Sequence, residues 1–331
     1  MIRFLQIPDD EKRNICQDVS NKIGAPPQAV EKDVWVTLML KMIFSSELAS
    51  HFIFKGGTSL SKAFDLIKRF SEDIDLGIDR RHLGFEGDLS KGQIRKLRRA
   101  SHTFVSGELK ELLKKQLDAH GVNGSWYELV VENTQVSDQD PETILVNYKS
   151  IYEENEVPYL QPKVKIEVSA RSLIEPYREV GLQSWIDDQY PDASFTEGAF
   201  PVTATDPQKT FLEKLILLHE EFQKPKEKIR HLRMSRHFYD IGQILNTKFG
   251  KLALTNHELF ESIIAHRKVL TPVKTTDYGK LTLKTLNVVP PEDRLHDFRS
   301  DYKEMQSSMI HGETMEFDDL LNEIVENLNQ G

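Results

Sequence analysis

The pattern of apolar and polar positions predicts strands in the first half of the chain and helices in the second. Residues 8–50 carry apolar positions at helical spacing, which predicts two helices. The apolar run HFIF at residues 51–54 predicts a strand, and SWYELVVENT, ETILVNYKSIY and PKVKIEVSAR predict three more that extend one sheet. Residues 90–120 predict a long, polar, basic helix, whereas residues 171–200 have the proline and glycine punctuation of loops.

From residue 205 onward the pattern is helical almost to the end of the chain. Thr205 and Pro207 predict the start of the first of these helices, because threonine is a preferred cap and proline is tolerated in a first turn. Further helices are expected over RHLRMSRHFYDIGQILN and at about residues 256–267, 292–308 and 316–329. We therefore predict an α+β protein, with an antiparallel or mixed sheet in a domain over residues 1–200 and a helical domain over residues 201–331.

Two glycines separate a predicted strand from a predicted helix. Gly56 and Gly57 end the apolar run, and Thr58 and Ser59 open TSLSKAFDLIKRF, which has the spacing of a capped amphipathic helix. Glycine lets the backbone approach a ligand closely, and the free N–H groups of a helix start favour anions. The turn is neither a G-x-x-x-x-G-K-[ST] loop nor a G-x-G-x-x-G turn. It nevertheless predicts a cradle for phosphates, to which the two hydroxyls add donors.

The next segment, SEDIDLGID, alternates between acidic and apolar positions as a half-buried strand does. Asp73 and Asp75 lie two residues apart, so they share one face, opposite Ile74 and Leu76. Two uncompensated carboxylates at this spacing repel each other, and a divalent cation removes that penalty. Glu167, in KIEV, is expected as the third carboxylate of such a site, in which one or two metal ions activate an attacking oxygen. These acids predict Mg²⁺ or Mn²⁺ beside the phosphate cradle.

Polar residues in the predicted helices add to these acids. Lys214 lies in the apolar helix FLEKLILLH, where it either reaches out to solvent or meets a phosphate. Asp240 lies among apolar residues, and a buried aspartate needs partners, for which Lys214 and Arg236 are the candidates. Asp240 is therefore expected either to brace these cations or to act as a base on an acceptor hydroxyl. Lys32 and Asp33 are expected to support the same pocket.

Ser71 and the charge of the chain complete the candidate chemistry. Ser71 precedes Asp73 by two residues and is expected to contact the phosphates or a water on the metal, or to cap the edge of the strand. The formal net charge of −9 argues against a chain that coats nucleic acid over its whole surface. Two basic stretches are either solvated helix faces or contacts for a phosphate-bearing ligand, and their residues are Arg95, Lys96, Arg98, Arg99, Arg230 and Arg233.

Composition places the chain in a broad class. Of its 331 residues, 39% are hydrophobic and 29% are charged, as in folded soluble proteins. The longest apolar runs are interrupted by charges and are much shorter than the roughly 20 residues of a membrane span. The first residues lack the apolar core of a signal peptide. We therefore expect a cytoplasmic protein, and the single cysteine excludes an internal disulfide.

The segment GGTSLSKAF followed by RFSEDIDL resembles the nucleotidyltransferase motif hG[GS]…Dx[DE]. Over roughly residues 28–280 the chain is similar to the AbiEii/AbiGii abortive-infection toxins, the toxin half of bacterial type IV toxin–antitoxin pairs. EKDVWVTLML resembles the N-terminal Lys-Asp helix of that family, and KIEV resembles its third-carboxylate strand. TFLEKLILLHE and RHFYDIGQIL resemble two downstream helical motifs, in which Lys214 and Asp240 stand at the matching positions. RKVLTPVKTTDYGKL resembles a later segment, and the last fifty residues match none.

The resemblance implies a nucleotidyltransferase-like mixed sheet followed by a helical domain that completes the active site. It also implies transfer of nucleotides from an NTP to an RNA acceptor, the 3′ end of tRNA, which blocks translation and growth. A cognate antitoxin is an implied partner, and the basic residues would contact the RNA backbone. The same chemistry on a protein or a small molecule, or a non-catalytic module that binds nucleotide or RNA, are the alternatives. The implied catalytic residues are Asp73, Asp75, Glu167, Lys214 and Asp240, and the implied nucleotide-binding residues are Gly56, Gly57, Thr58, Ser59, Ser71 and Lys214.

Overall fold

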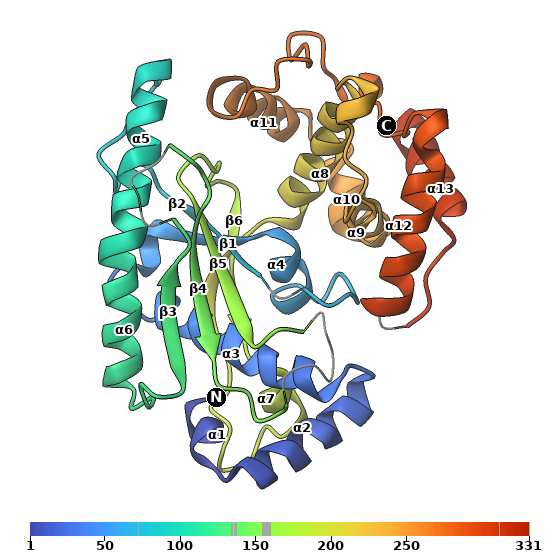
Figure 1. The fold of residues 1–331 in the computed structure, drawn as a ribbon. Coiled ribbons are helices and arrows are strands. Elements are labelled where there is room, and N and C mark those ends of the chain that lie inside the picture. The colour runs from blue at the N-terminus through green and yellow to red at the C-terminus, as the bar shows by residue number, and fades with distance from the viewer. Residues whose placement is uncertain (72, 134, 136–137, 154–159, 311, 331) are drawn as a thin grey trace. The chain divides into compact units, whose positions relative to one another are not determined.

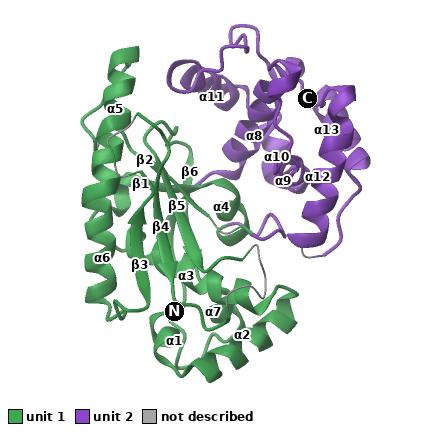
Figure 2. Ribbon diagram, viewed as in Figure 1, with its two compact units in different colours: residues 1–63, 71–204 green, residues 64–70, 205–331 purple. Residues whose placement is uncertain are grey.

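The computed structural model describes residues 1–71, 73–133, 135, 138–153, 160–310 and 312–330 (Figure 1). The chain divides into two compact units, which Figure 2 shows in different colours. Unit 1 comprises residues 1–63 and 71–204, and unit 2 comprises residues 64–70 and 205–331. The chain thus enters unit 2 twice, first for a segment of only a few residues between the glycine turn and the acidic strand.

Unit 1 contains a seven-stranded sheet with the strand order β3-β4-β5-β2-β1-β7-β6. Strand β2 pairs in parallel with β5 and antiparallel with β1, whereas β1 pairs in parallel with β7. Strands β3, β4 and β5 pair antiparallel. The sheet is therefore mixed and the protein is α+β, as the sequence predicted. The strands are β1 Phe52–Lys55, β2 Ile74–Ile78, β3 Tyr127–Val131, β4 Glu142–Tyr148, β5 Lys163–Ser169, β6 Tyr177–Leu182 and β7 Phe200–Thr205.

The helices of unit 1 largely follow the apolar spacing of the sequence. They are α1 Ile2–Gln6, α2 Asp9–Ile23, α3 Pro27–Phe44, α4 Gly56–Lys62, α5 Lys91–Phe104, α6 Lys110–Ala119 and α7 Trp185–Gln189. Helix α3 is buried along almost its whole length and packs against β5. Helices α5 and α6 are joined by the π-helical segment Val105–Leu109, so the predicted basic helix forms with one irregular turn (Figure 1).

The central strands of the sheet have one apolar face and one polar face. On β2 and β5, the side chains of Ile74, Leu76, Ile166 and Val168 are fully buried. Asp75, Lys165 and Glu167, which alternate with them, are half-buried polar residues. Since each buried aliphatic side chain contributes about 1.5–3 kcal/mol, a slip of the register by one residue would expose this whole set. The packing of the apolar face therefore fixes where the acids lie.

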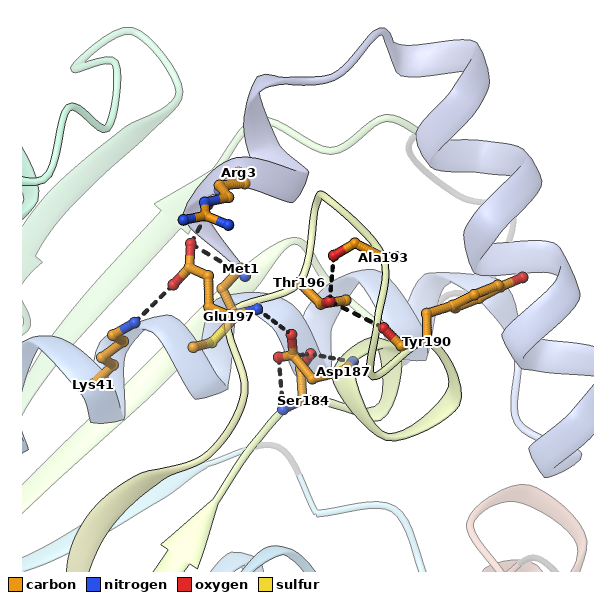
Figure 3. Close-up of polar contacts among 9 residues, drawn as sticks. All are labelled: Met1, Arg3, Lys41, Ser184, Asp187, Tyr190, Ala193, Thr196 and Glu197. Carbon is orange, nitrogen blue, oxygen red and sulfur yellow. Dashed lines mark hydrogen bonds and ion pairs between the residues drawn. The ribbon is translucent and has the colours of Figure 1, made fainter.

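Residues 171–200, which the sequence predicts as loops, contain strand β6 and helix α7. The prediction was wrong because neither element has long-range periodicity. Strand β6 is mostly exposed, and α7 is only five residues long. The start of α7 is held by a capping box, in which the side chains of Ser184 and Asp187 each accept a hydrogen bond from the other residue's N–H (Figure 3).

Glu197 fastens the loop before β7 to the first helices of unit 1 (Figure 3). Its carboxylate accepts hydrogen bonds from the Lys41 ammonium at 2.7 Å and from the Arg3 backbone N–H at 3.1 Å. The amino group of Met1 lies 3.5 Å from the same carboxylate. Burial acts to raise the pKa of Glu197, but the bond from Lys41, the charge of the Met1 amino group and the Arg3 N–H together lower it to about 2.

We expect Glu197→Gln to destabilise the protein at neutral pH and to have a smaller effect in acid. The pKa of this carboxyl is about 2 in the folded protein and has its ordinary value of 4.5 in the unfolded chain. The stabilisation is therefore complete above the unfolded value and is lost as the pH falls toward the folded value. At pH 7 the loss should be about 2–3 kcal/mol of the free energy of unfolding. Urea unfolding at pH 7 and pH 3 measures it, and equal losses at both pH values would contradict the assignment.

Unit 2 is helical over most of its length. Its helices are α8 Pro207–Phe222, α9 Ser235–Leu245, α10 Lys248–Ala253, α11 His257–Leu270, α12 Leu295–Ser308 and α13 Phe317–Gln330. Phe238, on α9, packs its ring against those of Phe222, Phe298 and Phe317 at centroid distances of 5.2–6.3 Å. None of the helices in the described ranges combines the length and the apolar character that crossing a membrane requires.

Helix α8 begins one residue later than the sequence predicted. Its N-cap is Asp206 rather than Thr205, and the Asp206 carboxylate accepts a hydrogen bond from the Gln208 N–H at 2.9 Å. Thr205 is instead the last residue of β7. Aspartate and threonine are both favourable caps, so the sequence alone does not decide between them.

The predicted helix over TSLSKAFDLIKRF was wrong in its length. Helix α4 spans only Gly56–Lys62, and Asp65 then adopts a left-handed conformation with φ +49°. Residues 64–70 belong to unit 2, where the Phe70 N–H donates a hydrogen bond to the carbonyl of Met309 at 2.8 Å. Contacts with distant residues therefore override the helical spacing of this segment.

Candidate active site

The glycine turn and the acidic strand lie against each other in unit 1. Lys55, the last residue of β1, is the cross-strand partner of Asp75 on β2. Gly56 follows with φ +78°, and a Cβ atom added there would lie 2.1 Å from the Asp75 Oδ2 atom. A side chain at position 56 would thus collide with the carboxylate as well as strain the backbone. The sequence prediction that the turn and the acids are neighbours is confirmed for Gly56 and Asp75.

The hydroxyl groups near the turn form bonds within the protein. The Thr58 hydroxyl donates to the carbonyl of Asp73 at 2.5 Å and lies 2.8 Å from the Ser71 hydroxyl. The Ser59 hydroxyl donates to the carbonyl of Gly56 at 2.9 Å. Thr58 and Ser59 are both buried. The Thr58 hydroxyl therefore ties the turn to the residue before the acidic strand, and the Ser59 hydroxyl bonds back within the turn. Their expected contact with phosphates stays a prediction.

The carboxylates lie on the polar face of the sheet. Asp75 and Glu167 are direct register partners on the parallel strands β2 and β5. Asp73 immediately precedes β2, and all three residues are half-buried. The Glu167 carboxylate forms an ion pair with the ammonium of Lys165, two residues earlier on the same strand, at 2.8 Å. Although burial opposes its charge, Glu167 and Asp73 raise the pKa of Lys165.

The donor set fits a magnesium ion in its chemistry and its register. Mg²⁺ takes one or two protein carboxylates and completes its shell with water and substrate phosphates, and oxygen ligands also suit Mn²⁺. Asp75 and Glu167, adjacent across β2 and β5, meet that requirement, with Asp73 two residues from Asp75. As placed, no group of three or more His, Cys, Asp or Glu side chains within the described ranges converges on one ion position. The Lys165 ammonium is the cation that now faces Glu167.

Helix α4 is anchored at its far end by α3. Lys62, its last residue, forms a buried ion pair with Asp33 of α3. The other oxygen of Asp33 accepts a hydrogen bond from the Trp185 N–H at 2.8 Å. Burial, the largest influence, raises the pKa of Asp33 despite the opposing charge of Lys62. Asp33 thus holds the helix that begins with the two glycines, whereas the Lys32 ammonium donates to the carbonyl of Gln161 at 3.1 Å.

Unit 2 contains a second cluster, around Asp240 on α9. The Arg69 guanidinium donates to both carboxylate oxygens of Asp240 at 2.7 Å, and the Lys214 ammonium lies 2.9 Å from Oδ2. Asp240 is completely buried, and Arg69 and Lys214 are 5% and 8% exposed. Burial acts to raise the pKa of Asp240, but the charges and hydrogen bonds of Arg69 and Lys214 hold it well below its usual range.

Asp240 is therefore a brace in this structure. A carboxylate that is fully ionised and bonded through both oxygens is a poor acceptor for a further proton. The sequence is compatible with both bracing and base catalysis by Asp240, with Lys214 and Arg236 as the partners to be braced. The structure confirms Lys214 and adds Arg69, which spacing along a helix could not reveal because it lies 171 residues away.

Lys214 is the cation of the cluster whose ammonium has an N–H group available for a ligand. Its ammonium lies 3.5 Å from the Nδ1 atom of His237 and 2.9 Å from Asp240. Burial, followed by the charge of Lys214, lowers the pKa of His237 well below its usual value, so its ring is neutral at physiological pH. Burial is also the main cause of the lowered pKa of Lys214. Within the described ranges two of its three N–H groups have partners, which leaves one for an anionic ligand.

The basic residues that the sequence singled out differ in their surroundings. Arg95 lies 3.3 Å from the carboxylate of Asp138. Arg230 forms an ion pair with Glu221 at 2.7 Å, which turns part of its guanidinium toward the protein. The backbone N–H of Arg233 donates to Asp301 at 2.6 Å. The side chains that are exposed are those of Arg95, Lys96, Arg99, Arg230 and Arg233, and Arg98 is half-buried.

The match to one protein family agrees with the motifs. The family described as "Nucleotidyl transferase AbiEii toxin, Type IV TA system" matches residues 38–323, well beyond the last residue of the sequence resemblance. Among solved structures, MenT4, a nucleotidyltransferase toxin from Mycobacterium tuberculosis, is 15% identical with a TM-score of 0.44 and covers 95% of this chain and 98% of its own. JHP933 from Helicobacter pylori is 12% identical with a TM-score of 0.45 and covers 92% and 91%. A comparison with curated proteins found no match.

Proposed function

Because the chain belongs to the AbiEii family of nucleotidyl transferase toxins from type IV toxin–antitoxin systems, we propose that it transfers nucleotides from an NTP to the 3′ end of tRNA in the cytoplasm. The observation that carries the proposal is the position of the Asp75 carboxylate, which lies against the Cα atom of Gly56 and beside Glu167. This arrangement brings a backbone turn suited to phosphates and a pair of carboxylates suited to Mg²⁺ to one place. The nucleotide and an antitoxin are the partners that family membership implies.

In this proposal the transfer is a displacement at the α-phosphorus of the NTP. The oxygen of the RNA 3′-hydroxyl forms the new P–O bond, the bond to the bridging oxygen breaks, and pyrophosphate leaves with the electron pair. Asp73, Asp75 and Glu167 would hold a divalent ion, which would neutralise phosphate charge and lower the pKa of the attacking hydroxyl. The proton of that hydroxyl passes to one of these carboxylates or to water. The glycine turn holds the phosphates through backbone N–H groups.

Lys214 and Asp240 have separate tasks in the proposal. The free N–H of Lys214 is assigned to a phosphate oxygen, where its compact charge offsets charge that develops during the transfer. Asp240 is assigned to holding the lysine, because both of its oxygens are engaged and its pKa is held low. The base on the acceptor hydroxyl is then sought among the three acids of unit 1.

Contact with RNA is assigned to exposed basic residues. Lys96 and Arg99 on α5 are exposed, as is Arg230 in unit 2. Neutralising phosphates with such residues releases counterions, so binding of the acceptor should weaken as salt is raised. The negative charge of the whole chain confines this interaction to local patches.

The acceptor is tested by expression of the wild-type chain and of Asp75→Ala, followed by sequencing of tRNA 3′ ends. We expect added nucleotides on tRNA from cells with the wild-type chain and unaltered ends with the variant. In parallel, purified protein is incubated with each labelled NTP and either total RNA or total protein. Label on protein, or on a small molecule, would show that the acceptor is not RNA. Growth arrest that persists with Asp75→Ala, without any labelled product, would instead favour a binding module.

A further inference from the structure

The segment of residues 64–70 is anchored in unit 2 along its length. The ring of Phe64 packs edge-on against Phe249 at a centroid distance of 6.2 Å. The backbone N–H of Lys68 donates to the hydroxyl of Tyr239 at 3.1 Å, and Arg69 forms an isolated β-bridge with Ile310. These contacts give the segment a defined path, although it has neither helix nor strand structure of its own.

The segment carries one buried cation, Arg69, whose guanidinium has two N–H groups placed to bind both oxygens of the Asp240 carboxylate. Its Nε atom donates to Oδ1 and its Nη2 atom donates to Oδ2, both at 2.7 Å. Two parallel bonds to one planar carboxylate fix both the position and the orientation of that carboxylate. A lysine at position 69 could keep the charge but not the second bond.

The orientation of the Asp240 carboxylate determines where the Lys214 ammonium lies. The Lys214 ammonium lies 2.9 Å from Oδ2, the oxygen that also accepts from Arg69. A carboxylate free to rotate would let the lysine follow it, because a lysine side chain is flexible and its ammonium has no preferred plane. The bond from Lys214 alone would therefore hold the lysine and the aspartate together without holding either in place.

We propose that Arg69 is a positioning residue for nucleotide transfer, which acts by locking the Asp240 carboxylate so that the Lys214 ammonium is presented in one fixed place. This inference rests on the proposed function for its catalytic consequence. Arg69 does not contact the nucleotide in this scheme. Its main effect on the reaction passes through Asp240 and Lys214.

The place of the segment in the sequence gives Arg69 a second consequence. The residue before the segment is Ala63, which follows helix α4, and the residue after it is Ser71, which bonds to Thr58 and leads to Asp73. The glycine turn and the acidic strand are thus the covalent neighbours of the segment that Arg69 anchors. Loosening the anchor should also loosen the chain that joins these two parts of the site.

The test uses the full-length protein with Arg69→Lys and Arg69→Gln. Arg69→Lys preserves the buried charge and is the variant expected to fold. Its kcat should fall about 10- to 100-fold, the range typical for loss of a supporting hydrogen-bond partner, while the KM for the NTP changes less than about threefold. Activities are normalised to the folded fraction in thermal unfolding. Wild-type kcat in a folded Arg69→Lys protein would overturn the proposal.

A second, non-kinetic readout keeps the inference separate from the proposed function. The positive charge of Arg69 adds to the burial that lowers the pKa of Lys214. In Arg69→Gln the pKa of Lys214 should therefore rise, and the NMR titration of its Nζ resonance, identified by its loss in Lys214→Arg, measures the change. If RNA is not the acceptor but this titration shifts, the coupling of Arg69 to Lys214 through Asp240 is supported and the proposed function fails. If the titration is unchanged in a folded protein, the coupling of Arg69 to Lys214 is contradicted.

Helix α8, which carries Lys214, also offers a matched control. Glu220 is buried and is held in a two-bond arrangement by Arg267, with the Nε–Oε1 distance at 2.9 Å. Arg267→Lys removes the same kind of two-bond contact between a guanidinium and a carboxylate, and it leaves Lys214 and Asp240 unchanged. We expect it to lower thermal stability and to leave kcat within about twofold of wild type. A loss of kcat as large as that of Arg69→Lys would reduce Arg69 to a general stabilising role.

Discussion

Asparagine in place of Asp75 is expected to abolish nucleotide transfer and leave the protein folded. The substitution keeps the shape of the side chain that lies against Gly56, so the packing of the turn should be preserved. It removes the negative charge of Asp75, the register partner of Glu167. The site then loses the ability to hold a divalent ion against the phosphates. We expect the rate to fall at least about 10³-fold, which corresponds to about 4 kcal/mol of lost transition-state stabilisation.

Transfer of label from an NTP to RNA measures this loss, and urea unfolding checks the fold. The matched control is Asp79→Asn, which removes a carboxylate directly after the other end of β2, where Asp79 pairs with Arg81. This variant should transfer at close to the wild-type rate. If Asp75→Asn kept more than about a tenth of the activity, the carboxylate could not be a ligand on which the reaction depends.

Alanine at position 56 is the second change with a large expected effect. Two costs add here, since the φ of +78° is unfavourable for an L-residue by about 1–2 kcal/mol, and the new Cβ would stand 2.1 Å from the Asp75 Oδ2 atom. The collision can be relieved only by moving the turn or the carboxylate. We therefore expect Gly56→Ala to lower stability by roughly 2–3 kcal/mol and transfer by about 10²-fold.

Gly24→Ala separates the two costs. Gly24 has a φ of +74°, and no atom of the described residues lies within 4 Å of an added Cβ, so this variant bears the backbone strain alone. It should lose about 1 kcal/mol of stability and no activity. Equal effects on activity from Gly56→Ala and Gly24→Ala would show that the contact between Gly56 and Asp75 does not matter for the reaction.

The parts of the fold that the sequence predicted are those with a strong local pattern. The alternation in SEDIDLGID placed Ile74 and Leu76 in the core and Asp73 and Asp75 on the polar face, and the structure agrees. The same period-two rule placed Glu167 on the polar face of a neighbouring strand, whereas its register with Asp75 is known only from the structure. Burial of one face fixes the register of a strand, so such patterns determine side-chain direction.

The parts that the sequence missed depend on contacts between distant segments. The spacing of TSLSKAFDLIKRF is helical as far as Phe70, yet the chain leaves the helix after Lys62 because residues 64–70 are held by unit 2. No spacing rule links Arg69 with Asp240. The only available cue was that a buried aspartate needs cationic partners, and it led to Arg236 as well as to Lys214.

The roles of the two hydroxyls show a different limit. Thr58 and Ser59 were expected at the phosphates because they open a helix after two glycines. The structure uses both groups to hold the turn, through the carbonyls of Asp73 and Gly56. Local side-chain-to-backbone bonds of this kind compete with ligand contacts for the same hydroxyl, and a sequence does not rank the two uses.

The most direct test of the account is a crystal structure of the protein with Mn²⁺ and a non-hydrolysable NTP, recorded with anomalous scattering from manganese. We expect a manganese peak at about 2 Å from oxygens of Asp75 and of Asp73 or Glu167, with a phosphate oxygen of the nucleotide on the same ion. Lys165 should then have left Glu167 if Glu167 is a ligand. A nucleotide bound with its manganese away from Asp73, Asp75 and Glu167 would contradict the account.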